Sequence, residues 1–260
     1  MNFSDSNISS ILTVGTIIGL YFLFAKLVPV EKSEYKTEKS FETLSAKYFV
    51  SDLKYMGIFL LLVVVSGYLF YEIFLLFTGF RTSVLSDALI VVSPDPGMLL
   101  APSLFCALLS SSLLLVFLIK TQLKDDWKEY MAYYNLKYKF NYAKVVVYLI
   151  RILTVITVVI TIASLDWFSS FGHKEIKINS FLSLGTKSYR YSDVSNVAKV
   201  MKVKAPSGKI LNEPYFLVTF NDGNTWSSIY NGFGDQQKNQ EIITLVSRQS
   251  NKAISQVEFE

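Results

Sequence analysis

Two ionisable residues, Glu72 and Arg151, lie inside apolar stretches long enough to cross a membrane, and they are the first candidates for chemistry. A charge in the hydrocarbon costs at least about 2.5 kcal/mol on the insertion scale, so such residues often belong to an ion or substrate path. Arg151 lies six residues after Val145, which is roughly 9 Å by helical rise, so its side chain can reach the headgroups. Glu72 is therefore the stronger candidate of the two.

Hydroxyl and small side chains form further patterns in the same stretches. Thr154, Thr157 and Thr161 lie on one side of a helix and would complete an intramembrane polar site with Glu72 and Arg151. Packing between helices, with each hydroxyl bonded to the carbonyl four residues earlier, is the simpler interpretation. Small residues at helix-contact spacing likewise predict close packing, and these are Gly15, Gly19, Ser103, Ala107 and Ser111.

Other reactive groups are scarce. The single cysteine, Cys106, excludes an internal disulfide framework, and the single histidine, His173, excludes bis-histidine haem and multi-histidine zinc sites. Adjacent carboxylates at Asp125 and Asp126 point in different directions on a helix and do not form an acid–base pair. The sequence has no GxxxxGK or GxSxG motif. We therefore expect no catalytic residues, no metal and no cofactor, and we do not expect an enzyme.

The composition indicates a membrane protein. Hydrophobic residues make up 51% of the 260 residues and charged residues 18%, where soluble domains carry about 25% charged residues. Four stretches reach the roughly 20 apolar residues that a spanning helix needs. We predict a membrane α-helical domain over 1–165, with spans at about 8–30, 57–80, 98–119 and 145–165, and a soluble domain over 166–260.

The lysine distribution predicts the orientation. The segment from Lys26 to Lys54 has six lysines, as has the segment from Lys120 to Lys144, whereas the segment between the second and third spans has only Arg81. Cytoplasmic loops carry the excess of Lys and Arg, so both termini are predicted to be extracytoplasmic, in a plasma or inner membrane. Residues 1–7 contain no Lys or Arg, so the first span is expected to be an uncleaved anchor.

Both lysine-rich segments also carry aromatic residues at helical spacing. We favour interfacial helices that form an aromatic belt at the headgroups over a docking surface for a partner. The residues concerned are Phe41, Leu44, Tyr48 and Phe49 in one segment, and Trp127, Tyr130, Met131 and Tyr134 in the other.

The C-terminal part changes to alternating patterns. Strands are predicted at 174–181, 187–192, 197–204, 215–220 and 225–230, and a helix at about 236–248. Asn221-Asp-Gly223 predicts a tight hairpin turn, because Asp-Gly supplies the positive φ that such a turn needs. The domain is thus expected to be α+β and rich in strands.

The stretch Tyr189-Arg-Tyr-Ser-Asp-Val-Ser-Asn-Val197, the hairpin Phe220-Asn-Asp-Gly-Asn-Thr-Trp226 and the closing helix resemble bacterial pleckstrin-homology-like (PH-like) domains fused to membrane spans. The resemblance covers roughly residues 170–255. It implies a β-rich domain with a closing helix, but no defined ligand. The sequence departs from that family in one respect, because about five strands are predicted where the full fold has seven.

Lys202, Lys204 and Lys209 could contact anionic lipid or an acidic partner, although a solvated strand edge is the simpler interpretation. Nucleic acid is not expected as a partner. We expect a non-catalytic, membrane-anchored binding or scaffolding module that contacts the bilayer and a protein or anionic lipid. The alternatives are a small transporter or channel subunit that uses Glu72 and the threonine face, and an inner-leaflet lipid-interacting regulator. The oligomeric state stays open.

Overall fold

The computed structural model describes residues 22–84, 88–181, 183, 185–204, 210–231 and 236–259. Most of the predicted span at 8–30, with Gly15 and Gly19, lies outside these residues. Within the described part, residues 22–27 are helical and the short helix η1 (Val30–Lys32) follows. The first of the four predicted spans therefore remains a prediction.

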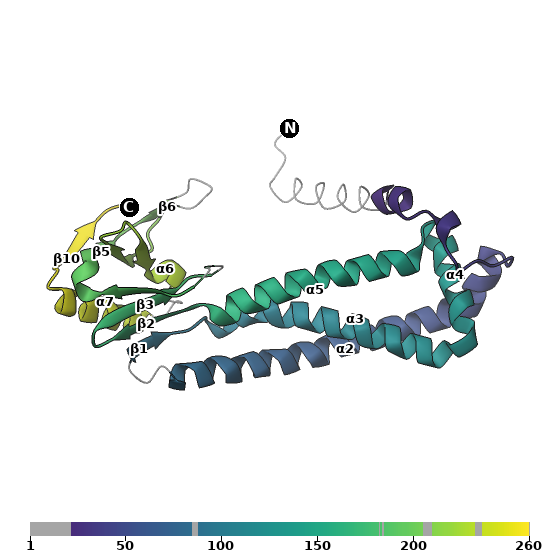
Figure 1. Cartoon of the computed structure of the whole chain (residues 1–260), viewed down its shortest axis with the longest axis horizontal. Helices are drawn as coiled ribbons and strands as arrows, with labels where there is room; N and C mark the ends of the chain where they lie inside the picture. Colours follow the sequence, from purple (N-terminus) through teal and green to yellow (C-terminus); the bar gives the residue numbers. More distant parts are fainter. Residues whose placement is uncertain are drawn as a thin grey trace. The chain divides into compact units, whose positions relative to one another are not determined.

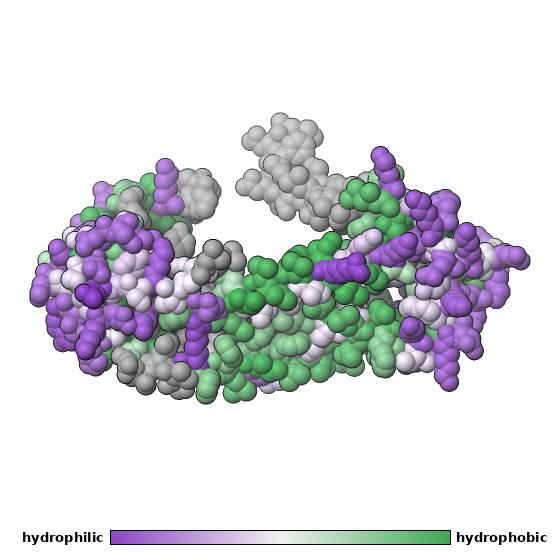
Figure 2. Space-filling model, viewed as in Figure 1, coloured by the Kyte–Doolittle hydropathy of each residue, from purple (hydrophilic) through white to green (hydrophobic). Residues whose placement is uncertain are grey.

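Among the described residues, three helices are long and apolar enough to cross a membrane, which is compatible with a multi-pass membrane protein. They are α2 (Phe41–Val84), α3 (Leu100–Leu123), which the short helix η2 (Pro96–Leu99) precedes, and α5 (Tyr142–Asp166) (Figure 1). They contain the predicted stretches 57–80, 98–119 and 145–165, called the apolar spans below. Figure 2 shows hydrophobic residues gathered over these helices, and leucines and valines such as Leu61 and Val64 are largely exposed, as lipid contact requires.

We predict an interfacial helix for the aromatic segment that begins at Phe41. In the structure this segment is not a separate helix but the first part of α2. No proline interrupts 41–84, so the helix continues without a break. The second lysine-rich segment forms η3 (Lys124–Asp126) and α4 (Trp127–Tyr138). Buried residues of the two segments pack against each other, where the predicted belt would face the headgroups. They include Leu44, Tyr48, Tyr55, Tyr130, Met131 and Tyr133.

The chain divides into two compact units that do not follow the predicted boundary at 165/166. The first, here called the helix unit, comprises the chain up to Ser66 together with Phe105–Thr157. The second, here called the sheet unit, comprises Gly67–Leu104 and Val158–Glu260. The sheet unit therefore contains ends of the long apolar helices as well as the β-rich part.

One sheet of the sheet unit takes its first strand from between two of the long apolar helices, α2 and α3. The strands β1 (Ala88–Val92), β2 (Phe168–Gly172), β3 (Glu175–Asn179) and β4 (Lys187–Arg190) pair in this order, all antiparallel. Val92 of β1 is paired with Ser169 and contributes a buried side chain to the core. The apolar Ala-Leu-Ile-Val-Val run after α2 is thus a strand and not a loop.

The second sheet has the order β10-β5-β8-β9 and is closed by a helix. Strand β10 (Ile254–Val257) runs parallel to β5 (Val194–Val200), and the other pairs are antiparallel. Trp226, Phe171, Ile242 and Val246 belong to a core that both sheets and α7 share. The remaining elements are η4 (Tyr191–Asp193), β6 (Val203–Lys204), β7 (Ile210–Leu211), β8 (Tyr215–Phe220), β9 (Thr225–Ser227), α6 (Ser228–Asn231) and α7 (Gln236–Ser250).

The predicted strand 215–220 is β8, and Gly223 has a φ of +81° in the turn to β9, as the hairpin requires. The predicted strand 197–204 is interrupted after Val200, and the strand expected to reach 230 ends at Ser227, where α6 begins. The predicted helix at 236–248 extends to Ser250.

Candidate functional site

The principal polar site of the helix unit lies where the first part of α2 meets α4, outside the apolar spans. Tyr48, Asp52 and Tyr55 follow at i, i+4 and i+7, which places them on one face of α2. This face meets α4, and the two carboxylates Asp52 and Glu129 lie within the contact. Each carboxylate is surrounded by lysine and tyrosine donors from the other segment.

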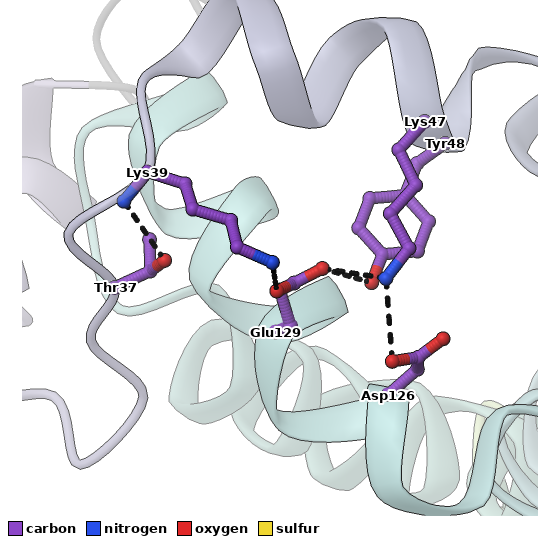
Figure 3. A network of polar contacts seen from close by, with 6 residues as sticks. All are labelled: Thr37, Lys39, Lys47, Tyr48, Asp126 and Glu129. Atoms are coloured by element: carbon purple, nitrogen blue, oxygen red, sulfur yellow. Dashed lines mark hydrogen bonds and ion pairs between the residues drawn. The ribbon is translucent and has the colours of Figure 1, made fainter.

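Glu129 is held by two lysines and one tyrosine (Figure 3). Lys39 donates to one carboxylate oxygen, while Lys47 at 2.7 Å and the Tyr48 hydroxyl at 2.9 Å donate to the other. Lys47 also lies 3.2 Å from Asp126. The hydrogen bonds from Lys39 and Lys47 lower the pKa of Glu129 to about 2. The group is therefore a carboxylate at neutral pH and has no proton to give.

Asp52 accepts four hydrogen bonds, two on each oxygen. The hydroxyls of Tyr130 and Tyr134 donate to Oδ1 at 2.8 and 2.9 Å. The Tyr133 hydroxyl at 3.1 Å and Lys137 Nζ at 3.0 Å donate to Oδ2. Burial raises the pKa of both Tyr130 and Tyr134, so these hydroxyls stay protonated and remain donors.

The arrangement can hold α2 against α4, because the acceptor positions of both carboxylates are directed at donors of the protein itself. In the described part of the chain, no group of three His, Cys, Asp or Glu side chains could hold a metal ion. We call this arrangement the tyrosine–carboxylate clamp, formed by Lys39, Lys47, Tyr48, Asp52, Glu129, Tyr130, Tyr133, Tyr134 and Lys137.

A second polar contact, in the sheet unit, joins the end of α2 to the end of α5. The Arg81 guanidinium donates to the backbone oxygen of Leu165 and, at 3.0 Å, to that of Asp166. It also lies 4.1 Å from the ring centroid of Phe168, on β2. The last carbonyls of a helix have no partner within the helix and attract cations, so Arg81 caps α5. The side-chain Oδ2 of Asp166 accepts a hydrogen bond from Asn179 of β3 at 2.5 Å, which extends the contact into the sheet.

The predicted intramembrane polar residues have differing surroundings. Glu72 is half-buried on α2, and Arg151 is exposed on α5. Thr154 is exposed and donates to the Ile150 carbonyl at 2.8 Å, within its own helix. Thr157 is buried and lies 3.4 Å from the Phe105 carbonyl of α3, and Thr161 is partly buried. Thr154 and Thr157 therefore have different environments.

The predicted helix-packing residues and the predicted anionic-surface lysines lie in different parts of the molecule. Ser103, Ala107 and Ser111 are buried, and the Ser111 hydroxyl lies 3.0 Å from that of Ser66 on α2. Lys202 pairs with Glu258 at 2.6 Å, Lys204 is exposed, and Lys209 lies outside the described residues. Asp52 and Glu129 were not among the predicted site residues, although Tyr48, Asp52 and Tyr55 place a carboxylate at helical spacing among tyrosines.

Comparisons of the chain with protein-family models, with curated proteins and with solved structures found no match.

Proposed function

We propose that this protein is a non-catalytic, membrane-anchored binding or scaffolding module whose sheet unit presents the contact surface. The observation that supports this most directly is the way the β-rich part is attached. Helix α5 ends at Asp166 and β2 begins at Phe168, while β1 enters the same sheet from the segment after α2. The sheet is held at the helix ends by the connection of α5 to β2, by the connections of β1 to its flanking helices and by the Arg81 contact. A flexible linker would instead let the sheet move relative to these helix ends.

The strand count supports a PH-like domain. The C-terminal part alone was predicted to have about five strands, two fewer than the full fold. With β1 added, the four-stranded sheet and the antiparallel strands β5, β8 and β9 together make seven, and α7 packs against their shared core. In this proposal, the segment between two membrane spans supplies a strand that the C-terminal part lacks.

The pairing of β1 with β2 also supports the proposed topology. If α2, α3 and α5 span the membrane, strands that pair must lie on the same side, so the lysine-poor segment after α2 and the C-terminal part share one side in this proposal. By the lysine distribution this side is extracytoplasmic, with a first span at 8–30 that places the N-terminus there too, in a plasma or inner membrane.

Thiol labelling of intact cells tests this topology. Ser192→Cys in a Cys106→Ser background is the probe, because Ser192 is exposed, whereas Ser227 is buried and would label poorly. Lys128→Cys, at an exposed position of α4, is the matched control. An impermeant reagent is expected to label position 192 and not position 128. The reverse result would overturn the topology and favour the inner-leaflet regulator with Lys202, Lys204 and Lys209.

Photo-crosslinking in living cells tests the binding function. A photoreactive amino acid at the exposed positions Ser192, Glu213 or Asn221 is expected to give discrete adducts with one protein or with lipid. The same probe at lipid-facing Leu69 of α2 is the control and should give only bilayer adducts. Absence of discrete adducts at all three positions would contradict the proposal.

The transporter alternative has a test of its own. Loss of the cellular phenotype in a folded, inserted Glu72→Ala variant would favour the transporter instead.

A further inference from the structure

Strand β10 has one edge without a partner among the described residues. It is the terminal strand of its sheet and pairs only with β5 (Figure 1). The Val257 carbonyl accepts from Met201 N–H at 3.0 Å, so the main-chain groups of Val257 face β5. Because these groups alternate along a strand, those of Ile254 and Gln256 face the opposite, open edge.

This edge lacks the features that usually prevent strand pairing. Soluble domains protect edge strands with charged residues, prolines or bulges. The strand reads Ile-Ser-Gln-Val, without charge or proline, and its pairing with β5 is regular. Ile254, Ser255 and Gln256 are all exposed, Ile254 to 40%. The edge is therefore available to another strand.

The charges that flank β10 identify the occupant. Lys252 precedes the strand and Glu258 follows it, and both are exposed. One oxygen of Glu258 already pairs with Lys202 of the same chain at 2.6 Å, so a lysine of a second copy would share this carboxylate. In an antiparallel pair of two β10 strands centred on Ser255, Lys252 of each copy lies opposite Glu258 of the other. The same register places Ile254 opposite Gln256, so the main-chain groups that face the open edge would bond to each other. The strand is thus complementary to itself in both charge and hydrogen bonding.

We propose that two copies of this protein associate through antiparallel pairing of their β10 strands, with Ser255 at the two-fold axis. Such an interface is isologous, because each copy contributes the same surface. It joins the second sheets of the two copies into one continuous sheet. The inference goes beyond the proposed function and does not depend on it, since it concerns self-association and not the partner.

Disulfide trapping of the full chain in native membranes tests this pairing. Directly opposed residues at a non-hydrogen-bonded site of an antiparallel pair have Cα atoms about 4.5 Å apart, within the range of a disulfide. Ser255→Cys in a Cys106→Ser background is therefore expected to shift from monomer to disulfide-linked dimer under mild oxidation. Ser192→Cys in the same background controls for random collision and should stay monomeric. A monomeric Ser255→Cys variant, or equal dimer at both positions, would overturn the proposal.

Further variants test the edge and the register. Gln256→Pro removes an N–H that faces the open edge and leaves the bonds to β5, so it is expected to abolish the Ser255→Cys dimer. Lys252→Glu should reduce the dimer because it places a second carboxylate opposite Glu258, and the neutral variant Lys252→Gln should reduce it less. A dimer that persists with proline at 256, or that Lys252→Glu leaves unchanged, would contradict the pairing.

Discussion

The α2–α4 contact of the helix unit is built from tyrosines around carboxylates, whereas the core of the sheet unit is built mainly from Val, Ile, Phe and Trp, with only two tyrosines, Tyr189 and Tyr191, among its buried residues. Both contacts exclude water from aromatic rings. A tyrosine also carries a hydroxyl that can bond to a charge, so it allows a mostly buried Asp52 next to other aromatic rings. The sheet unit instead stabilises its core by apolar burial, with Trp226 fully buried edge-on to Phe171 at 5.3 Å. Substitutions in the sheet unit should therefore act mainly through lost apolar burial, and those at the α2–α4 contact mainly through lost hydrogen bonds and ion pairs.

The largest expected effect is in the sheet unit. Replacing Trp226 by alanine removes a fully buried ring and its bond to Ser169, which should cost about 3–5 kcal/mol of unfolding free energy. Hydrogen exchange of the full chain should show faster exchange in β2, β8 and α7, with α4 unchanged. Trp226→Phe, which keeps a ring, is the control and should have a smaller effect. Equal acceleration in α4 would show that the two units are not independent.

The next effect is in the helix unit. Asp52→Ala leaves three tyrosine hydroxyls and Lys137 without their acceptor, and loss of one partner of a mostly buried polar cluster should cost roughly 2–4 kcal/mol. Hydrogen exchange of residues 127–138 should accelerate, while that of β2 and β8 stays the same. Asp52→Asn keeps one acceptor oxygen, so its exchange rate in residues 127–138 is expected to lie between those of the wild-type chain and Asp52→Ala. Unchanged exchange in α4 would exclude the clamp as a stabilising element.

The smallest effect is pH dependence at Glu129. Its pKa is about 2 in the folded chain, below the ordinary value of 4.5. The stabilisation from Lys39 and Lys47 is therefore complete above about pH 4.5 and is lost as the pH falls through about 2. Because both lysines are partly exposed, the effect should be under about 1 kcal/mol.

Thermal unfolding of the wild-type chain and of Glu129→Gln measures this dependence. The difference between their Tm values should be largest near pH 7 and shrink below about pH 4. Groups that titrate alike in both chains cancel in this difference. A difference that grows as the pH falls would have the wrong sign for an ion pair.

The sequence could predict features that depend on neighbouring residues, but not those that depend on a distant segment of the chain. Alternation in the C-terminal part identified β8 and the hairpin at Gly223, because each of these depends on neighbouring residues. Strand β1 was not predicted, since an apolar run of five residues near a membrane span looks like a loop until β2 is beside it. Strand β2, with Ser169 and Ser170 both buried, has no alternating pattern.

The clamp was missed for a related reason. Tyr48, Tyr130 and Tyr134 were recognised as aromatic faces of two segments, but helical spacing does not say which other segment a face will meet. Asp52 and Glu129 gain their donors only when α2 and α4 come together, about 80 residues apart in the chain. The three helices long enough to span a membrane could be predicted because apolar length alone determines them.

The origin of β1 has a consequence for synthesis of the protein. Ala88 pairs with Gly172, so the first strand of the sheet leaves the ribosome about 80 residues before its neighbour, which at 5–20 residues per second is roughly 4–16 s. During this interval α3 and α5 are made, and β1 lacks its partner β2. If α3 and α5 span the membrane as proposed, the sheet can be completed only when both helices cross it or neither does. A chain in which only one of the two helices inserts would leave β1 and β2 on opposite sides of the bilayer, unable to pair.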